Sequence, residues 1–394
     1  MYRLDEKEAS AVRKVLRSGK LFRHGLGGRG ECERFEAEFA RKLGVKEALL
    51  VTSGTGALAA ALGACGVGPG DEVVVPAYTF VATPLAVAGV GAVPVVANVD
   101  ESLTLCPKDL KRRITSRTRA VIAVHMDGLS CDMTAILRLA RASGLRVIED
   151  AAQALGGSYR GRRLGSWGDF GCFSFNQDKI LTCGEGGAVV GSDRRLFDRA
   201  VCMHDGATAF TTPRWRGRKA GAPFLGGAMR VSEISGAILR VQLPRLDGLL
   251  DQLRARKRLW VSALAGSADW RVVSSRDPAG DCGTSVHLAF ASPENGQRAA
   301  AALRDLGLEA ATLTERPGHA VWQWMDYFTT GRAAHHPRLD PFTLARLRPS
   351  YRLDDYLETL LHATRTVRIG MDPTFSLKMT RTLAEKARTR LQRL

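Results

Sequence analysis

The stretch Glu149-Asp150-Ala151-Ala152-Gln153 decides the fold and, together with two later segments, the chemistry. The stretch 145–148, apolar except for Arg146, precedes it, so an acid is expected to close a strand. The later segments are Cys172-Phe173-Ser174-Phe175-Asn176-Gln177-Asp178-Lys179 and Gly184-Glu185-Gly186-Gly187. A carboxylate, a hydroxyl and an amine are the groups that would hold the ring nitrogen, the phosphate and the aldehyde of a phosphorylated pyridine aldehyde.

The composition is that of an ordinary globular protein. The chain has 394 residues, of which 45% are hydrophobic and 25% charged, so two domains are expected. No apolar run is long enough to cross a bilayer, and residues 1–20 are charged and amphipathic rather than signal-like. We therefore expect a cytoplasmic protein that does not enter the membrane.

Eight cysteines are scattered along the chain without a C-x-x-C pair, and no histidine stands at metal-ligand spacing from them. We therefore expect reduced thiols and no metal site. The net charge is +17, from 57 basic and 40 acidic residues. This charge raises a nucleic-acid hypothesis, but no reader motif accompanies the dispersed arginines, which favours a solvated basic surface. Attraction of an anionic substrate, such as a phosphorylated or nucleotide-linked sugar, is an intermediate interpretation.

Strand and helix signals alternate along the first part of the chain. This alternation predicts an α/β fold in which helices cover both faces of a three-layer, mostly parallel sheet. Ligands bind beyond the carboxyl ends of such strands, which is where Asp150 stands. The expected strands are residues 48–51, 72–75, 93–97, 119–124 and 145–149.

The second part of the chain is less regular. A long amphipathic helix is expected over residues 230–250, and strand and helix candidates follow between residues 270 and 306. We predict a large α/β domain over residues 1–250, which includes an N-terminal helical segment, and a smaller C-terminal α+β domain over residues 251–394.

Residues 316–351 are too aromatic for a solvated linker. A lid and the cover of an interface are both open interpretations. Trp322 and the pair His335-His336 are candidate substrate neighbours in this region. The substrate pocket is expected to depend on the loops of residues 21–30, 204–223 and 317–341.

A glycine-rich turn, Ser53-Gly54-Thr55-Gly56-Ala57, leads from an expected strand into a helix. The free amides of a helix N-terminus bind phosphate, whereas plain capping by Ser53 or Thr55 is the alternative. Asp150 has two interpretations as well: a cap for the next helix, or the partner of a pyridinium nitrogen. Lys179 is either a surface lysine or an amine that forms a Schiff base and then acts as general base and acid.

Several segments, in this order and spacing, resemble the DegT/DnrJ/StrS family of sugar aminotransferases. That family uses pyridoxal phosphate and has the type I, aspartate-aminotransferase-like transferase fold. The resemblance covers residues 30–250, with a weaker similarity beyond. The segments that carry it are Ser53-Gly54-Thr55, Gly70-Asp71-Glu72-Val73, Pro76-Ala77-Tyr78-Thr79-Phe80-Val81-Ala82-Thr83, residues 149–153, residues 174–179 and residues 184–187.

The resemblance implies a role for each matching residue. Lys179 would carry the Schiff base, Asp150 would hold the ring nitrogen, Gln153 would lie near the ring hydroxyl, and Phe80 would stack on the ring. The phosphate would be bound by the residues of the glycine-rich turn and the serine of the second segment, namely Gly54, Thr55, Gly56 and Ser174.

The chain departs from the family pattern at Gly226-Gly227-Ala228-Met229-Arg230, where relatives often have G-x-N-Y-R. The family asparagine reaches the phosphate in the neighbouring subunit of a homodimer with shared active sites, and Ala228 cannot. Compensation by Arg230 and a weaker hold on the phosphate are the two alternatives.

The resemblance also implies a reaction. Glutamate or glutamine would donate an amino group, through the cofactor, to the ketone of a sugar, free or nucleotide-linked, or of a cyclitol, in the biosynthesis of amino-sugar or aminocyclitol natural products such as antibiotics. The triplet Asn176-Gln177-Asp178 is closer to members that act on cyclitol ketones. A sugar dehydratase on the same scaffold is one alternative, although such relatives have histidine in place of Lys179. A non-catalytic binding or regulatory protein is the other.

Overall fold

The computed structural model describes residues 4–24, 26, 30–206, 224, 226–347 and 351–394. Of the loops expected to shape the substrate pocket, residues 25, 27–29 and 207–223 lie outside the described residues. All eight cysteines are free. No helix in the described part of the chain is long and apolar enough to cross a membrane.

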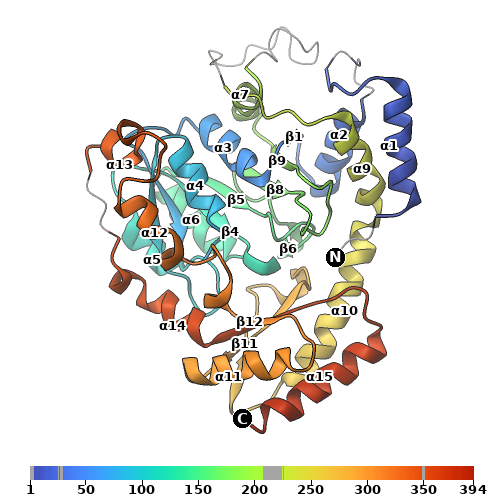
Figure 1. Cartoon of the computed structure of the whole chain (residues 1–394). Helices are drawn as coiled ribbons and strands as arrows, with labels where there is room; N and C mark the ends of the chain where they lie inside the picture. The colour runs from blue at the N-terminus through green and yellow to red at the C-terminus, as the bar shows by residue number, and fades with distance from the viewer. Residues whose placement is uncertain (1–3, 25, 27–29, 207–223, 225, 348–350) are drawn as a thin grey trace.

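A seven-stranded sheet forms the centre of the larger part of the molecule (Figure 1), and its order is β1-β9-β8-β5-β4-β2-β3. Every neighbouring pair from β8 to β3 is parallel, whereas β9 is antiparallel to both β8 and β1. The predicted mostly parallel sheet is confirmed. The strands are β1 Glu47–Val51, β2 Glu72–Pro76, β3 Val93–Ala97, β4 Thr118–Val124, β5 Arg146–Asp150, β8 Phe170–Ser174 and β9 Gly187–Gly191.

Helices cover both faces of this sheet because successive strand residues point to opposite sides. Leu49 and Val73 belong to one hydrophobic core, while their neighbours Leu50 and Val74 belong to another. The first core includes residues of α3 Gly54–Ala64, α4 Ala82–Gly89, α7 Arg194–His204 and α12 Val321–Thr329. The second includes residues of α2 Glu31–Leu43, α5 Pro107–Arg113, α6 Met133–Ala142 and α9 Glu233–Gln242. The result is the predicted three-layer arrangement.

A second, antiparallel sheet with the order β10-β11-β13-β12 lies toward the C-terminus and has a hydrophobic core of its own. The predicted domain boundary at residue 250 falls inside helix α10, and the division into residues 1–250 and 251–394 stays a prediction. The remaining elements are α1 Glu6–Ser18, β6 Ser158–Tyr159, β7 Arg162–Arg163, α10 Leu246–Leu264, β10 Trp270–Val272, β11 Ser285–Phe290, α11 Pro293–Arg304, β12 Ala310–Thr312, α13 Pro341–Leu344, α14 Leu357–Arg365, β13 Thr366–Gly370 and α15 Leu377–Leu391.

The single helix predicted over residues 230–250 is wrong. Helix α9 ends at Gln242, a 3₁₀ turn covers Leu243–Arg245, and α10 begins at Leu246. Pro244 has no N–H to donate to the preceding turn, which interrupts the α-helical ladder at this point. The amphipathic pattern continues across the turn, so apolar spacing alone does not reveal it.

The aromatic segment packs against the larger part of the molecule. Trp324 and Phe328 of α12 are fully buried in the core that also contains α3 and α4. The backbone N–H of Val321 donates to the carbonyl of Ala77 at 2.8 Å. The segment is therefore attached to the loop that follows β2 and carries Phe80.

Candidate active site

A cavity of about 920 Å³ lies where the central strands end, and elements of both sheets wall it. Asp150 at the end of β5 and Ser174 at the end of β8 place the predicted polar groups on one wall. The cavity gathers seven of the nine predicted site residues: Gly54, Thr55, Phe80, Asp150, Gln153, Ser174 and Lys179. Gly56 and Arg230 are not among the lining residues.

The carboxylate of Asp150 is buried at this wall, 7% exposed. The Thr83 hydroxyl donates to Oδ2 at 2.9 Å and the N–H of Ala152 donates to Oδ1 at 3.1 Å. Burial raises the pKa of Asp150, while these hydrogen bonds and the charge of Lys179 act in the opposite direction. A cationic N–H inside the cavity would favour the charged carboxylate further.

Thr83 was not predicted to have a role, although it closes one of the motif segments. It lies in α4 and is itself fully buried. Its hydroxyl is 2.8 Å from that of Thr79. Because Thr83 donates to Asp150, it accepts from Thr79, and the two hydroxyls form a relay that ends on the carboxylate.

The neighbouring acid, Glu149, has a structural role. Its side chain is fully buried and accepts from three backbone N–H groups within residues 165–168, at 2.6 to 2.8 Å. It also accepts from Nε2 of His125 at 3.0 Å, because Nδ1 of that ring accepts from the backbone N–H of Cys131. Glu149 therefore fixes the turn before β8, while Asp150 faces the cavity.

Lys179 lies in the loop between β8 and β9, where its backbone N–H donates to the carbonyl of Asn176 at 3.0 Å. Burial lowers the pKa of its amine, the charge of Asp150 opposes this, and the nearby charge of Arg316 adds to the lowering. A lower pKa leaves more free amine at neutral pH, as a nucleophile or a general base requires.

The start of α3 forms a cradle for an anion. The Ser53 hydroxyl caps the helix by accepting from the N–H of Gly56 at 3.0 Å. The amides of Gly54 and Thr55 precede the first intrahelical donor, so they remain for a ligand. A Cβ on Gly54 would lie 3.0 Å from the Cβ of Ser174, so glycine lets the helix end approach this hydroxyl.

Two further residues suit a flat, polar ring. The Oε1 atom of Gln153 accepts from the backbone N–H of Asp127 at 3.2 Å, which leaves its NH₂ group as a donor. The side chain of Phe80 lines the cavity and is 45% exposed. The donors, the buried acid, the amine and the aromatic ring together fit a phosphorylated pyridine aldehyde.

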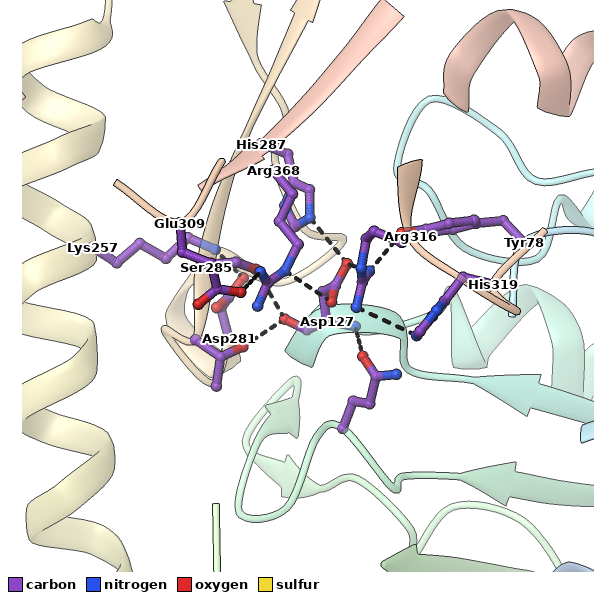
Figure 2. Close-up of polar contacts among 12 residues, drawn as sticks. Tyr78, Asp127, Lys257, Asp281, Ser285, His287, Glu309, Arg316, His319 and Arg368 are labelled. Carbon is purple, nitrogen blue, oxygen red and sulfur yellow. Dashed lines mark hydrogen bonds and ion pairs between the residues drawn. The ribbon is translucent and has the colours of Figure 1, made fainter. Parts of the chain in front are cut away.

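The opposite wall of the cavity was not predicted from the sequence, and Figure 2 shows it. Asp127, just beyond β4, forms ion pairs with Arg316 at 2.7 Å and Arg368 at 3.3 Å. Nε2 of His287 lies 3.2 Å from the same carboxylate. Burial raises the pKa of Asp127, but the charges of Arg316 and Arg368 and the hydrogen bond with His287 outweigh it and hold this pKa well below its usual range. Asp127 could have been predicted as a site residue, because it is a carboxylate just beyond a parallel strand. The two arginines could not, because no local sequence pattern distinguishes them.

Some predicted residues lie elsewhere. Arg230 forms an ion pair with Asp205 at 2.8 Å. A role of Arg230 at the phosphate bound by a partner subunit stays a prediction. Trp322, His335 and His336 are not among the described residues that line the cavity. His319, from the same aromatic region, does line it, and its ring lies 5.1 Å from that of Phe80.

Comparisons with known proteins show which family and fold the chain is similar to. The 3-amino-5-hydroxybenzoate synthase of Amycolatopsis mediterranei (strain S699) is 36% identical over 332 residues, 83% of either chain. The L-glutamine:2-deoxy-scyllo-inosose aminotransferase of Micromonospora echinospora is 40% identical over 256 residues, which are 63% of this chain and 61% of that protein. A crystal structure of 3-amino-5-hydroxybenzoic acid synthase matches with a TM-score of 0.82 and 28% identity, over 100% of this chain and 98% of the other.

Residues 2–332 match the model of the DegT/DnrJ/EryC1/StrS aminotransferase family. Members of this family depend on pyridoxal phosphate, and the fold neighbours confirm the predicted transferase fold. The chain is an aminotransferase that belongs to the DegT/DnrJ/EryC1/StrS family.

Proposed function

We propose that the cavity binds pyridoxal phosphate and that the enzyme moves an amino group from glutamate or glutamine to the ketone of a sugar or a cyclitol. One observation carries the proposal: Asp150, Lys179 and the amides at the start of α3 line the same cavity. The three groups match the ring nitrogen, the aldehyde and the phosphate of one molecule.

When bound, the cofactor supplies an electron sink for the bond that is broken at the substrate carbon. Asp150 keeps the ring nitrogen protonated, and Thr83 keeps Asp150 charged. Ser174 and the amides of Gly54 and Thr55 bind the phosphate.

Three further side chains serve the ring and the substrate. Phe80 would pack on the ring, and the NH₂ group of Gln153 would donate to the ring hydroxyl. The amine of Lys179 would move a proton between the substrate carbon and the aldehyde carbon of the cofactor, in one direction with the donor and in the other with the acceptor, as its lowered pKa allows.

A keto-cyclitol is the first candidate acceptor, which the triplet Asn176-Gln177-Asp178 and one relative support. One relative is named for 2-deoxy-scyllo-inosose, a name that supports a cyclitol ketone here too. The Nδ2 atom of Asn176 donates to Glu185 at 3.0 Å, and both side chains line the cavity. A free or nucleotide-linked keto-sugar is the second candidate, favoured by the basic charge of the chain. In either case the product belongs to amino-sugar or aminocyclitol biosynthesis, including that of antibiotics.

We further propose a cytoplasmic homodimer in which each subunit completes the other's site. Arg230 does not line the cavity of its own chain, which supports a role toward a partner. Sedimentation equilibrium of the enzyme loaded with cofactor tests this assembly, and a monomer at micromolar concentration would exclude it.

The decisive experiment combines cofactor labelling with a substrate screen. Borohydride treatment of the loaded enzyme, followed by peptide mapping, should tag Lys179, and Lys179→Ala should lack turnover. Keto-cyclitols and keto-sugars are then offered to the aminated enzyme. A gained amine supports transamination, whereas loss of a hydroxyl without amination would indicate a dehydratase. A label on another lysine, or full activity of Lys179→Ala, would refute the assignment.

The same measurements distinguish a non-catalytic protein from an aminotransferase and from a dehydratase. A binding or regulatory protein would show no cofactor spectrum and no turnover, and charge-driven nucleic-acid binding would fade as salt rises.

A further inference from the structure

A single glutamine side chain holds the backbone of the loop that carries Lys179. Gln242 is the last residue of α9, directly before the 3₁₀ turn, and it is fully buried. Its Oε1 atom accepts from the backbone N–H of Thr182 at 2.9 Å, and its Nε2 atom donates to the carbonyl of Thr182 at 2.7 Å. The side-chain amide therefore pairs with both backbone groups of one residue, as a residue on a neighbouring antiparallel strand does.

Thr182 also ties the loop to itself. Its hydroxyl donates to the carbonyl of Phe175 at 3.2 Å and accepts from the N–H of Gly184 at 3.0 Å. The N–H of Phe175 in turn donates to the carbonyl of Gly186 at 2.8 Å. These bonds close the base of the loop, so residues 176–181 connect two fixed ends.

Lys179 lies three residues before the point that Gln242 holds. The two residues between them, Ile180 and Leu181, are buried in the core that also contains α2 and α9. Apolar contacts of this kind have no preferred direction, whereas the two hydrogen bonds of the amide are directional and end on one backbone position. The lysine side chain therefore starts from a fixed point beside the wall that carries Asp150.

The amine of Lys179 is sensitive to this placement. Burial lowers its pKa, the charge of Asp150 opposes this, and the charge of Arg316 adds to the lowering. All three influences weaken when the amine moves toward solvent and away from the two charges. Thr182 is 2% exposed, so without the amide its N–H and carbonyl would lose partners that water does not readily replace, and the loop would have to rearrange.

We propose that Gln242 is a positioning residue for the Schiff-base lysine, because its amide fixes the loop that presents the Lys179 amine to the cavity. This inference rests on the proposed role of Lys179. In the condensation, the neutral amine nitrogen bonds to the aldehyde carbon, and the aldehyde oxygen leaves as water with the two protons of the amine. Gln242 is not among the described residues that line the cavity, so it acts through the loop backbone.

The experiment compares three variants with the wild type. Gln242→Met keeps the volume of the side chain and removes both hydrogen bonds. In Gln242→Glu the protonated acid keeps both bonds, since its hydroxyl donates and its carbonyl accepts, and burial favours this form at about pH 6. The control for a general loss of stability is Leu391→Ala, which truncates a buried side chain of α15 in the separate core of the second sheet.

Two readouts are independent of turnover. Trace labelling of the apoenzyme with acetic anhydride at several pH values, followed by mass spectrometry of the Lys179 peptide, gives the pKa of that amine. Stopped-flow mixing of the apoenzyme with pyridoxal phosphate gives the rate of condensation.

We expect Gln242→Met to move the pKa of Lys179 up toward that of an ordinary lysine and to slow condensation by about 10- to 100-fold. Gln242→Glu should stay close to the wild-type rate at about pH 6 and lose this advantage as the carboxylate forms. Leu391→Ala should lower the Tm and leave the pKa of Lys179 unchanged.

A wild-type pKa and condensation rate in Gln242→Met would overturn the proposal. Equal changes in Gln242→Met and Leu391→Ala would do so too, because general loosening would then be the cause, as would equal losses in Gln242→Met and Gln242→Glu at about pH 6. If Gln242→Met does not fold, Gln242→Asn, whose amide is one methylene shorter, provides the same comparison. If the labelling result is as expected but the cofactor bonds to another lysine, the proposed function fails and the positioning of the amine stands.

Discussion

Replacing Thr83 by valine removes the hydroxyl that supports the charge of Asp150 while it nearly preserves the shape of the side chain. Both residues are buried, and the bond between Oγ1 and Oδ2 measures 2.9 Å. No solvent replaces the lost donor at this site, so burial would raise the pKa of Asp150 further. The carboxylate would then hold a protonated ring nitrogen less well.

The size of the effect follows from the kind of bond. A hydrogen bond to a charged group contributes about 1.5–3 kcal/mol, which corresponds to about 10- to 100-fold in affinity. We therefore expect Thr83→Val to weaken pyridoxal phosphate binding by that factor at pH 7. Thr79→Val should have a smaller effect, because it removes only the donor that feeds Thr83.

The assay is a titration of apoenzyme with pyridoxal phosphate, followed by absorbance at several pH values. Thr83→Ser is the matched control, since it keeps the hydroxyl and loses a methyl group. Wild-type affinity in Thr83→Val would refute the reasoning. An equal loss in Thr83→Ser and Thr83→Val would also refute it, because packing rather than the hydroxyl would then matter.

Three further predictions test other parts of the site. The pKa of Asp150 is raised in the folded state, so the charged carboxylate destabilises the fold as the pH rises above the pKa of the unfolded chain. Asp150→Asn should therefore raise the Tm of the apoenzyme at pH 7 but not at pH 3. The same substitution should slow amino-group transfer by on the order of 100-fold or more. A Cβ at Gly187 would overlap the backbone of Ser53, so Gly187→Ala should destabilise the protein by about 1–3 kcal/mol in thermal unfolding and weaken cofactor binding. The control is Gly248→Ala on α10, where a Cβ would meet open space; it should stabilise the protein by about 0.5–1 kcal/mol. Ala228→Asn should tighten pyridoxal phosphate binding about 10-fold in the dimer, and an unchanged dissociation constant would show that the amide does not reach the phosphate.

The wall of the cavity that holds Asp150 was predictable because its residues belong to short motifs at strand ends. Parallel strands bring their carboxyl ends to one edge, so Asp150 at the end of β5 and Ser174 at the end of β8 could be placed together without any knowledge of long-range contacts. Lys179 follows within a few residues and shares this placement. The three-layer fold was predictable for the same reason, since alternating elements leave few other arrangements.

The other wall was not predictable, because it joins residues that are far apart in sequence. Arg316 lies 189 positions from Asp127, and Arg368 lies 241 positions away. Neither arginine belongs to a periodic pattern, and each resembles the many surface arginines of this basic chain. The interruption at Pro244 was missed for a different reason: the apolar spacing of a helix survives a 3₁₀ turn.

Asp127 has two roles that compete: it holds the two sheets together, and it sets the charge of the cavity wall. Its ion pairs tie β13 and the Arg316 segment to the loop beyond β4, so the carboxylate helps to position the second sheet against the first. A second buried acid beside it would neutralise both arginines and strengthen that contact, but no charge would remain for a substrate. With one carboxylate for two guanidiniums, the contact between the two sheets forms without a ligand. The surplus positive charge stays available to bind an anion. The arrangement therefore leaves a preformed positive site in the cavity wall, and part of the stability that full neutralisation would provide is given up for it.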